Sequence, residues 1–392
     1  MSAPASSKLA DVASINPRLT SRPADDDLIS FVPMSAVDGQ TGTTEMGEER
    51  AFGEVSKGYT VFSDKDVLVA KITPCFENGK IAQAGLKHRI GVGSTEFHVI
   101  RPNQTRLDAR YLLHFLRRPQ VRVAGERRMT GSAGQRRVPE AFLAGLSVPT
   151  PSLLEQKRIA DVLDRADELR AKRRESLAHL DVLTQSIFLE MFGGTHSILT
   201  DWPTATLGEL LDFLTSGSRG WAVHYADHGD LFLRIQNVRG GELLLEDVAY
   251  VQAPETAEAR RARVEPGDVL LSITADLGRT AVVPDGLSTA YINQHLSILR
   301  CSKLEPVYLS AYLSSPIGQD QILRRNRQGV KAGLNFDDVK GVAIPCPPRA
   351  IQLKYAERTE AVRRLRTQYR TSSAELDALF ASLQDRAFRG LL

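Results

Sequence analysis

The sequence predicts an α+β fold in which two duplicated, mixed α/β globules are separated by two long helices that pair with each other. Two observations lead to this prediction. Residues 153–192 contain no Gly or Pro, and apolar residues recur in them every three and four positions, which is typical of a helix with one apolar stripe. The same pattern returns 196 positions later. A fixed offset over about 45 residues indicates an internal duplication.

The first long helix is expected over residues 153–192. Pro149 and Pro151 precede it and Gly193 follows it, and these are suitable start and stop signals. At a rise of 1.5 Å per residue such a helix is roughly 60 Å long. A helix of this length with half of its surface apolar is not stable alone in water, so another element must lie along it.

The second long helix is expected over residues 349–388 and supplies that partner. It repeats the first helix at the offset of 196 positions, so that Gln156 corresponds to Gln352 and Phe192 to Phe388. The residues just before each helix repeat as well. The register of the apolar stripe is therefore the same in both helices, and the two stripes can cover each other.

The duplication divides the chain into four segments. We expect a first globule over residues 1–152, a first helical segment over 153–194, a second globule over 195–348 and a second helical segment over 349–392. A chain of 392 residues is too long for one hydrophobic core, which supports several domains. In each globule, short strands and turns precede a helix and then a basic stretch.

Composition and charge set the cellular context. The apolar share of 42% and the charged share of 25% are ordinary for a soluble protein, and the net charge of +3 permits a nucleic-acid partner. No run of 18 apolar residues is present and the first residues do not resemble a secretory signal, so we expect no membrane association. Cys75, Cys301 and Cys346 lie far apart, which indicates a reducing, cytoplasmic setting.

Motifs for catalysis are missing from the sequence. It contains neither a phosphate-binding G-x-x-x-x-G-K-S/T motif nor a G-x-G-x-x-G motif, and it lacks the N-P-P-Y or D-P-P-Y tetrapeptide of adenine methyltransferases. The acidic run at 25–27 and the pair His224 and His228 are better interpreted as loop residues than as metal ligands. We therefore expect a protein that is not an enzyme and that holds no metal or cofactor.

Basic stretches recur at the same place in both globules. A guanidinium group can hold a phosphate, or it can read O6 and N7 of guanine in the major groove of DNA. A single surface arginine is more often simply solvated, but recurrence at one position in two copies favours contact with phosphate. The candidate DNA-binding residues of these stretches are Arg127, Arg128, Arg136 and Arg137 in the first globule and Arg324, Arg325, Arg327 and Lys331 in the second.

A turn that differs between the globules supplies further candidates. Matching strands end in Ile72-Thr73 and in Ile273-Thr274, and the residues that follow are different. Because the scaffold repeats while this turn has diverged, the two globules are expected to read different bases. The candidates for contacts to bases or to the DNA backbone are Lys71, Thr73, Asn78 and Lys80 in the first globule and Thr274 and Arg279 in the second.

Several short motifs together form a recognisable pattern. They are Pro149-x-Pro151, Glu155 to Ile159, Met191 to Gly193, Trp202-Pro203 with Leu207-Gly208, residues 66–80, and Ala387 to Gly390. With these motifs the sequence resembles, over essentially its whole length, the DNA-specificity (S, HsdS) subunits of type I restriction–modification systems. One position departs from the pattern, because Ile351 precedes Gln352 where the first copy has Glu155 before Gln156.

This resemblance implies a function in host defence. In the family, each globule is a target-recognition domain that reads one half of a split double-stranded DNA site. The two helices form an antiparallel coiled coil that acts as a spacer and docks two modification subunits. The resemblance thus implies a non-catalytic subunit that directs adenine methylation or restriction by modification and restriction/translocase subunits. S-adenosylmethionine, ATP and Mg²⁺ are then expected only on those partner subunits.

Two alternatives from other functional classes remain open at this stage. The chain could be a coiled-coil scaffold that binds other proteins without sequence-specific DNA recognition, and weak, salt-insensitive DNA affinity would favour that interpretation. It could also be a fused methyltransferase with disguised motifs, in which case the isolated chain would bind S-adenosylmethionine.

Overall fold

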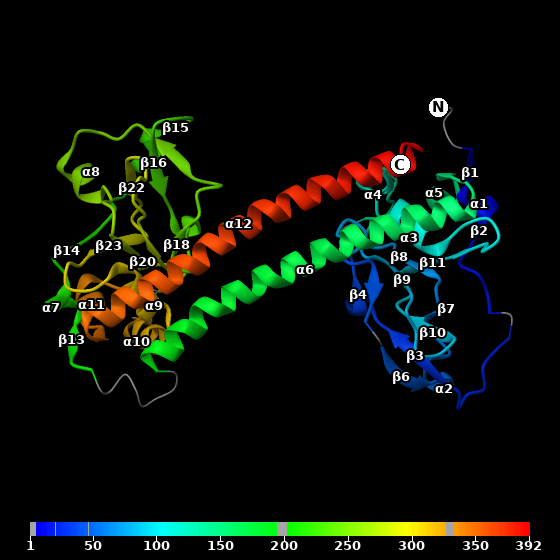
Figure 1. The fold of residues 1–392 in the computed structure, drawn as a ribbon, viewed down its shortest axis with the longest axis horizontal. Helices are drawn as coiled ribbons and strands as arrows, with labels where there is room; N and C mark the ends of the chain where they lie inside the picture. Colours follow the sequence, from blue (N-terminus) through cyan, green and yellow to red (C-terminus); the bar gives the residue numbers. More distant parts are fainter. Residues whose placement is uncertain (1–4, 20, 46, 133, 194–201, 327–332) are drawn as a thin grey trace. The chain divides into compact units, whose positions relative to one another are not determined.

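The computed structural model describes residues 5–19, 21–45, 47–132, 134–193, 202–326 and 333–392. The chain divides into two compact units, Met1–Ser176 with Tyr369–Leu392 and Leu177–Gln368. Each unit contains one head and parts of two long helices, α6 (Leu153–Phe192) and α12 (Arg349–Phe388) (Figure 1). The predicted mixture of sheets with two long helices is confirmed.

The head of the first unit contains two main sheets. The larger has the order β2 (Ala13–Ile15), β11 (Phe97–Pro102), β8 (Val67–Ala70), β9 (Ile81–Gln83), β5 (Thr43–Thr44) and β4 (Val37–Asp38). The smaller has the order β6 (Glu48–Ala51), β3 (Leu28–Val32), β10 (Ile90–Gly93) and β7 (Thr60–Ser63). The helices of this head are α1 (Leu9–Val12), α2 (Phe52–Val55), α3 (Ala109–Leu116), α4 (Pro119–Glu126) and α5 (Glu140–Ala144).

The head of the second unit repeats this plan with a four-stranded sheet in place of the six-stranded one. Its main sheets have the orders β14 (Phe213–Ser216), β23 (Leu296–Arg300), β20 (Val269–Ser272), β21 (Thr280–Val282), and β15 (Tyr225–Ala226), β19 (Ala249–Val251), β16 (Asp230–Leu233), β22 (Ala290–Ile292). A hairpin joins β17 (Val238–Arg239) to β18 (Glu242–Leu243). The helices are α7 (Leu207–Leu210), α8 (Ala257–Ala262), α9 (Pro306–Ser314), α10 (Pro316–Arg325) and α11 (Phe336–Lys340).

The central strand of each head is buried on both faces. In β8, Val67 and Val69 belong to the core beneath α3, while Leu68 points into the core on the other side of the sheet. In β20, Leu270 likewise points away from the core to which its neighbours Val269 and Leu271 belong. A continuous apolar run is the sequence expected of a strand that is covered on both sides.

A buried ion pair fixes the beginning of each central strand. The Asp66 carboxylate accepts hydrogen bonds from Nε and Nη2 of Arg101 at 2.8 and 2.7 Å, and it is 2% exposed. In the second head, Asp268 accepts from Arg300 at 2.7 and 2.9 Å. Since removal of one partner would leave a buried charge unpaired, both copies keep both partners.

Short two-stranded ladders close each head next to its long helix. β1 (Ser6–Lys8) pairs antiparallel with β12 (Ser147–Pro149), which lies just before α6. In the second head β13 (Thr204–Thr206) pairs in the same way with β24 (Ala343–Pro345), just before α12. The chain therefore enters and leaves each head side by side.

Buried glutamines secure the beginning of each long helix. The Oε1 of Gln156 accepts from the backbone N–H of Asp108 at 2.8 Å, and the Oε1 of Gln352 accepts from that of Glu305 at 2.9 Å. Both side chains are almost fully buried, so each satisfies backbone groups that water cannot reach. The offset of 196 positions thus relates contacts as well as residue types.

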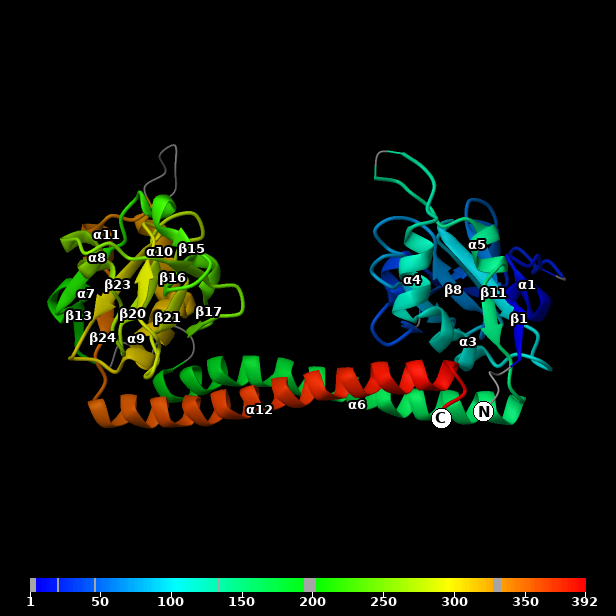
Figure 2. The same cartoon turned by 90° about the horizontal axis from the view of Figure 1, so that it is seen from above.

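The two long helices run antiparallel, as the resemblance implied. In the first unit, Ile159 and Leu163 near the beginning of α6 share a core with Phe380 and Phe388 near the end of α12. The guanidinium of Arg170 also pairs with Asp377, with Nε 2.6 Å from Oδ1. Contact between the beginning of one helix and the end of the other requires opposite directions. In this unit the helices lie side by side (Figure 2).

The second unit contains the other halves of the same helices. Ile187, Phe188 and Phe192 near the end of α6 pack against Tyr355 and Val362 near the beginning of α12. An ion pair between Glu190 and Arg358, at 3.1 Å, borders this core. The order of contacts again requires antiparallel helices.

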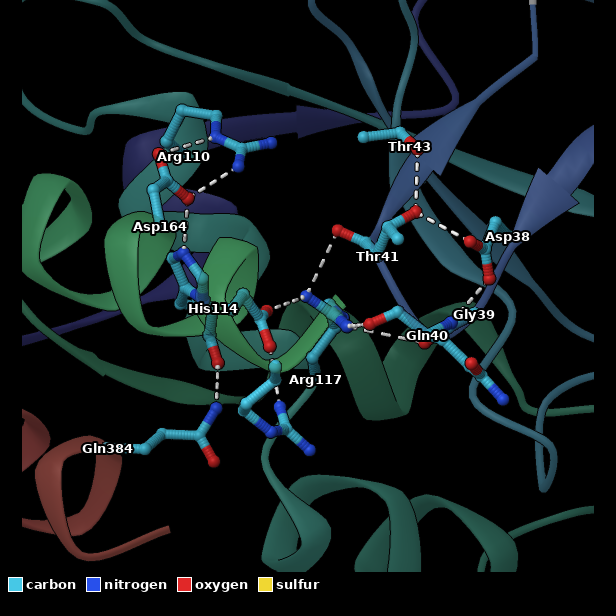
Figure 3. Close-up of polar contacts among 12 residues, drawn as sticks. Asp38, Gly39, Gln40, Thr41, Thr43, Arg110, His114, Arg117, Asp164 and Gln384 are labelled. Atoms are coloured by element: carbon cyan, nitrogen blue, oxygen red, sulfur yellow. Dashed lines mark hydrogen bonds and ion pairs between the residues drawn. The ribbon is translucent and has the colours of Figure 1, made fainter. Parts of the chain in front are cut away.

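A polar joint connects the first head to α6 (Figure 3). We define the first joint as Arg110, His114 and Arg117, which lie on α3 or directly after it, with Asp164 and Asp167 of α6. Nε of Arg110 is 3.1 Å from Asp164, Nε2 of His114 is 2.7 Å from Asp164, and Nη1 of Arg117 is 2.9 Å from Asp167. The joint is largely shielded from water, which strengthens each of these pairs.

Two further contacts extend the first joint. Arg117 donates to the backbone carbonyls of Gly39 and Gln40 in the turn between β4 and β5. The side-chain amide of Gln384, on α12, donates to the carbonyl of His114 at 3.0 Å. The first joint therefore links the head to both long helices.

Candidate nucleic-acid interface

The candidate residues of the first head meet at the end of β8. Residues that follow this strand pair with the basic stretch, because Ile72 forms an antiparallel bridge with Arg137. The backbone N–H of Val138 donates to Lys71 O at 2.8 Å, and that of Thr73 donates to Arg136 O at 2.9 Å. Two groups of candidates that are more than fifty positions apart in the sequence therefore lie side by side.

The basic stretch itself folds back as a hairpin. Thr130 and Arg137 exchange two backbone hydrogen bonds, at 3.0 and 2.8 Å. In Figure 2 the segment between α4 and α5 extends away from the body of this head. Arg127 and Arg128, at the end of α4, are exposed, and in the described part of the chain neither has an ion-pair partner.

The second head has the same arrangement. Thr274, just after β20, forms an antiparallel bridge with Gly333, and the backbone N–H of Leu334 donates to Ile273 O at 2.9 Å. Arg327 and Lys331, both predicted as DNA-binding residues, lie outside the described residues. Gly333, where the described chain resumes, thus occupies the place of Arg137 in the first head.

The register of the central strands corrects one detail of the sequence alignment. Val67 pairs with Ile100 and Val269 pairs with Leu299, so β20 corresponds to β8 at an offset of 202 positions. Thr274 therefore occupies the place of Ile72 and does not correspond to Thr73. The alignment of Ile72-Thr73 with Ile273-Thr274 was wrong by one position. It followed a chance identity of residue types, whereas the strand pairing gives the correct correspondence.

Arg137 is held by a carboxylate. Its Nε and Nη2 donate to Oε2 and Oε1 of Glu96 at 2.9 and 2.8 Å, and its Nη1 donates to the backbone carbonyl of Gln135 at 3.3 Å. The hydrogen bonds from Arg137 lower the pKa of Glu96 below its ordinary value, so the carboxylate is charged at neutral pH. Arg137 remains 42% exposed in spite of these bonds.

The remaining candidates of the first head differ in how far they are engaged. Arg136 lies 3.7 Å from Glu77, and the hydroxyl of Thr73 donates to the same carboxylate at 2.8 Å. Asn78 is exposed. By contrast, the ammonium of Lys80 donates to two backbone carbonyls, those of Met34 at 2.8 Å and Val37 at 3.2 Å. Lys80 is thus a structural tie between its turn and the loop before β4.

In the second head, two candidates are engaged with protein groups. Arg325 donates to the backbone carbonyls of Gln321 and Gly341 at 3.0 and 2.6 Å, and so it joins α10 to the end of α11. Arg279 pairs with Asp276, with Nε 2.6 Å from Oδ2.

Two further candidates of this head are Arg324 and Thr274. Arg324 pairs with Asp320 at 2.8 Å, and its side chain is 78% exposed. The Oγ1 of Thr274 lies within hydrogen-bond distance of His295 Nδ1. Arg324 is therefore the most accessible of the described basic candidates here, and Thr274 has a titratable neighbour.

Sequence reasoning missed Glu96 and His295. Both stand one residue before matching strands, β11 and β23, and both carbonyls accept from the residue that directly follows the central strand, Lys71 or Ile273. Their unlike side chains concealed the correspondence. The position before a matched strand was the available signal.

Sites for a metal ion or for a membrane find no support among the described residues. Among the described residues, no group of three or more His, Cys, Asp or Glu side chains could hold a metal ion. Within the same residues, no helix combines the length and the apolar character that a membrane crossing needs. The geometry thus defines a class of protein with two related heads, each of which carries a diverged turn beside a basic segment.

Known proteins resemble this chain in sequence over part of its length. Residues 6–179 match the family described as type I restriction modification DNA specificity domain. The EcoEI specificity subunit of Escherichia coli is 41% identical over 184 residues, which cover 46% of this chain and 30% of that protein. The EcoAI specificity subunit, also of Escherichia coli, is 40% identical over 184 residues and is covered to 31%. The chain thus matches about a third of the length of these two relatives.

Solved structures share the fold over the whole chain. A chain from a type I R-M system, studied for its complex assembly and conformational transition, has a TM-score of 0.62 at 22% identity, covering 100% of this chain and 98% of that one. The S subunit from M. genitalium has a TM-score of 0.57 at 14% identity, covering 98% and 96%. The resemblance is confirmed: this chain carries a type I restriction modification DNA specificity domain and has the fold of S subunits.

Proposed function

We propose that the chain is the sequence-specific DNA-binding subunit of a type I restriction–modification complex. Each head reads one half of an asymmetric, bipartite site, and the complex directs adenine methylation or restriction there. The chain is non-catalytic, and S-adenosylmethionine, ATP and Mg²⁺ act on partner subunits in the cytoplasm. The four segments 1–152, 153–194, 195–348 and 349–392 serve as head, spacer, head and spacer.

One observation carries the proposal. In both heads the end of the central strand lies beside a basic segment, through the bridges Ile72–Arg137 and Thr274–Gly333. A scaffold that recurs with different side chains at its tip is suited to reading two different half-sites. Exposed guanidinium groups beside such a tip can hold phosphates while neighbouring polar groups reach base edges.

The candidates divide by their contacts. Arg127, Arg128, Arg136 and Arg324 are exposed and suit phosphate, as do Arg327 and Lys331 by their place in the sequence. Lys80 and Arg325 support the turns, because their charged groups are directed to backbone carbonyls. The candidates for base contacts are Lys71, Thr73, Asn78 and Arg137 in the first head and Thr274 and Arg279 in the second.

The long helices suit a role in docking. Large apolar side chains are exposed along them, including Leu169, Val182 and Leu183 on α6 and Leu365 and Leu379 on α12. Exposed apolar positions of this kind mark protein–protein interfaces. Because the helices are copies of each other, they offer equivalent faces to two modification subunits, and restriction/translocase subunits join that assembly.

Co-expression with the neighbouring modification subunit tests this function. Mapping of methylated adenines in the host genome should give a split, asymmetric motif. An unbroken palindrome, or no motif, would contradict the proposal. The scaffold alternative predicts instead that DNA affinity is weak and independent of salt, whereas contacts to phosphate make affinity fall steeply as salt rises.

A further inference from the structure

The strongest remaining feature is the pair Arg137–Glu96 at the tip of the first head. A guanidinium group has five N–H donors in a fixed plane. Three of them are engaged, two with Glu96 and one with the Gln135 carbonyl. This leaves two N–H groups, one on Nη1 and one on Nη2. They lie at the distal end of a side chain that is 42% exposed.

The Glu96 carboxylate determines which part of DNA these two N–H groups can bind well. Arg137 and Glu96 together carry no net charge, so a phosphate gains little from approaching the pair and meets a nearby anion. A base edge is neutral, so binding to it depends on the positions of the hydrogen-bond donors and not on charge. Guanine presents two acceptors, O6 and N7, to such a fork, whereas adenine presents one acceptor beside a donor.

The rigid positions of Glu96 and Arg137 also favour a contact to a base. Both Glu96 and Arg137 are anchored through the backbone, Glu96 O to the N–H of Lys71 at 2.8 Å and Arg137 to Thr130 in the hairpin. Base reading requires donors in a fixed position, while a phosphate can be held by a mobile cation. Arg127 and Arg128 are of the mobile kind, since they are exposed and have no ion-pair partner in the described residues.

We propose that Arg137, oriented by Glu96, reads a guanine in the half-site of the first head. The inference rests on the proposed function and adds the base and the residues. The second head lacks this device: His295 stands where the first head has Glu96, and Gly333 stands where it has Arg137. The guanine contact therefore belongs to one half-site only.

Selection of duplexes from a randomised library by the full-length chain tests the proposal. The wild-type chain should select a two-part sequence with a guanine at one position of one half. Arg137→Lys keeps the charge but loses the fork, and it should reduce the preference for that guanine by roughly ten- to a hundredfold. Glu96→Gln should also weaken this preference, because it releases the guanidinium from its orientation.

Arg127→Ala and Arg128→Ala are the matched controls. Each should weaken binding to all duplexes alike and lower the slope of log affinity against log salt by roughly one, with the guanine preference unchanged. If Arg137→Ala lowers the salt slope by roughly one and Arg137→Lys leaves the guanine preference intact, Arg137 is a phosphate contact and the inference is overturned. A thermal melt confirms that each variant is folded.

Replacement of the selected guanine by 7-deazaguanine provides a second readout, because it removes the N7 acceptor alone. Wild-type affinity should fall, while the affinity of Arg137→Ala should not change further. An equal fall in both would overturn the inference. Selection of a two-part sequence without any effect of these changes refutes the inference only, whereas selection of no two-part sequence refutes the proposed function with it.

Discussion

In the first unit, two arginines and a histidine of the head face two aspartates of α6, whereas in the second unit two of the five corresponding positions are apolar and the two charged ones pair with each other. The positions that match Arg110, His114, Arg117, Asp164 and Asp167 are Val307, Ala311, Ser314, Glu360 and Arg363. We define these five positions as the second joint. In it, Glu360 is directed to Arg363 of its own helix, at 2.7 Å.

Aromatic packing is more extensive in the second joint. Phe188 stands at the place of Gln384 of the first unit, and its ring lies 6.2 Å from that of Tyr308 on α9. Phe192 and Phe388 occupy matching places and contact Tyr308 and Tyr111 of the two heads.

The lesson is that one duplicated scaffold can attach its heads with different mixtures of ionic and apolar contacts, because α12 also pairs with the second head through Arg366–Glu242 and through Arg349–Glu305 at 2.6 Å. Since the first joint holds a buried histidine beside a carboxylate and Ala311 stands at the matching place in the second, the first joint should respond more strongly to pH.

Phe192→Ala should have the largest effect. The side chain is fully buried and lies 4.8 Å from the ring of Tyr308 and 5.3 Å from that of Tyr355. Its removal should lower the free energy of unfolding of the second unit by about 4 kcal/mol. Urea unfolding followed by tryptophan fluorescence measures this, because Trp202 and Trp221 both lie in that unit. A cost that changes between low and high salt would contradict an apolar joint.

Arg117→Ala should cost the first unit about 2 kcal/mol, because it removes a buried hydrogen-bonded guanidinium from Asp167, which keeps Arg170 as its second partner. Hydrogen exchange should rise in α3 and in the turn at residues 39–41, whose carbonyls lose their donor. The matched variant in the second head, Ser314→Ala, should cost no more than about 1 kcal/mol, because it removes only the hydrogen bond to Thr280 at 2.7 Å. Equal effects of the two variants would show that the joints do not differ.

Acidification should loosen the first joint selectively. Burial lowers the pKa of His114 below its ordinary value, and Nδ1 has no hydrogen-bond partner among the described residues. The folded protein therefore holds this ring neutral, while the unfolded chain takes up a proton below about pH 6.5. Stability conferred by the neutral ring is thus present above that pH and is lost as pH falls, by up to about 1.4 kcal/mol per pH unit.

The carboxylate of the same pair acts at lower pH. Burial opposes its ionisation, but hydrogen bonds from His114 and Arg110 lower the pKa of Asp164 to about 2. Its contribution is present above about pH 4 and is lost between pH 4 and 2. Hydrogen exchange of the first head at pH 7 and pH 5.5 separates the two groups, and His114→Ala, which copies Ala311 of the second head, should abolish the difference. A pH response that survives in His114→Ala would assign it to another group.

The smallest effect should be the same in both heads. The hydroxyl of Tyr111 donates to Pro149 O at 3.0 Å, and that of Tyr308 donates to Pro345 O at 2.8 Å. Tyr111→Phe and Tyr308→Phe should each cost about 1 kcal/mol, since each leaves a carbonyl without its donor. Unequal costs in the two heads, measured by hydrogen exchange, would show that the duplication is not conserved here.

Much of the fold could be predicted from the sequence. The apolar period of residues 153–192 and its recurrence gave both helices, and the repeat of Gln156 as Gln352 marked equivalent contacts. These features depend on local periodicity and on spacing, which a sequence displays directly. The six-stranded order of the larger sheet could not be predicted, because it depends on pairings between distant strands such as β5 and β9.

The candidate site was harder to predict. A sequence shows that a residue is basic, but it does not show what its charge contacts. Lys80 is directed to carbonyls 46 and 43 positions away, and Arg325 to one 16 positions away. The role of Glu96 could be recognised only from the structure, in which its carboxylate accepts a hydrogen bond from Arg137. Long-range contacts of this kind carry no local signature.

The division of the chain into two units has a consequence for biosynthesis. The second unit is one continuous stretch, Leu177–Gln368, whereas the first needs Tyr369–Leu392 as well as Met1–Ser176. A ribosome releases the second unit complete while the first still lacks Phe380 and Phe388 from its core. The head that is made first is thus finished last. A nascent chain that stops early would leave the N-terminal head open and spare the other.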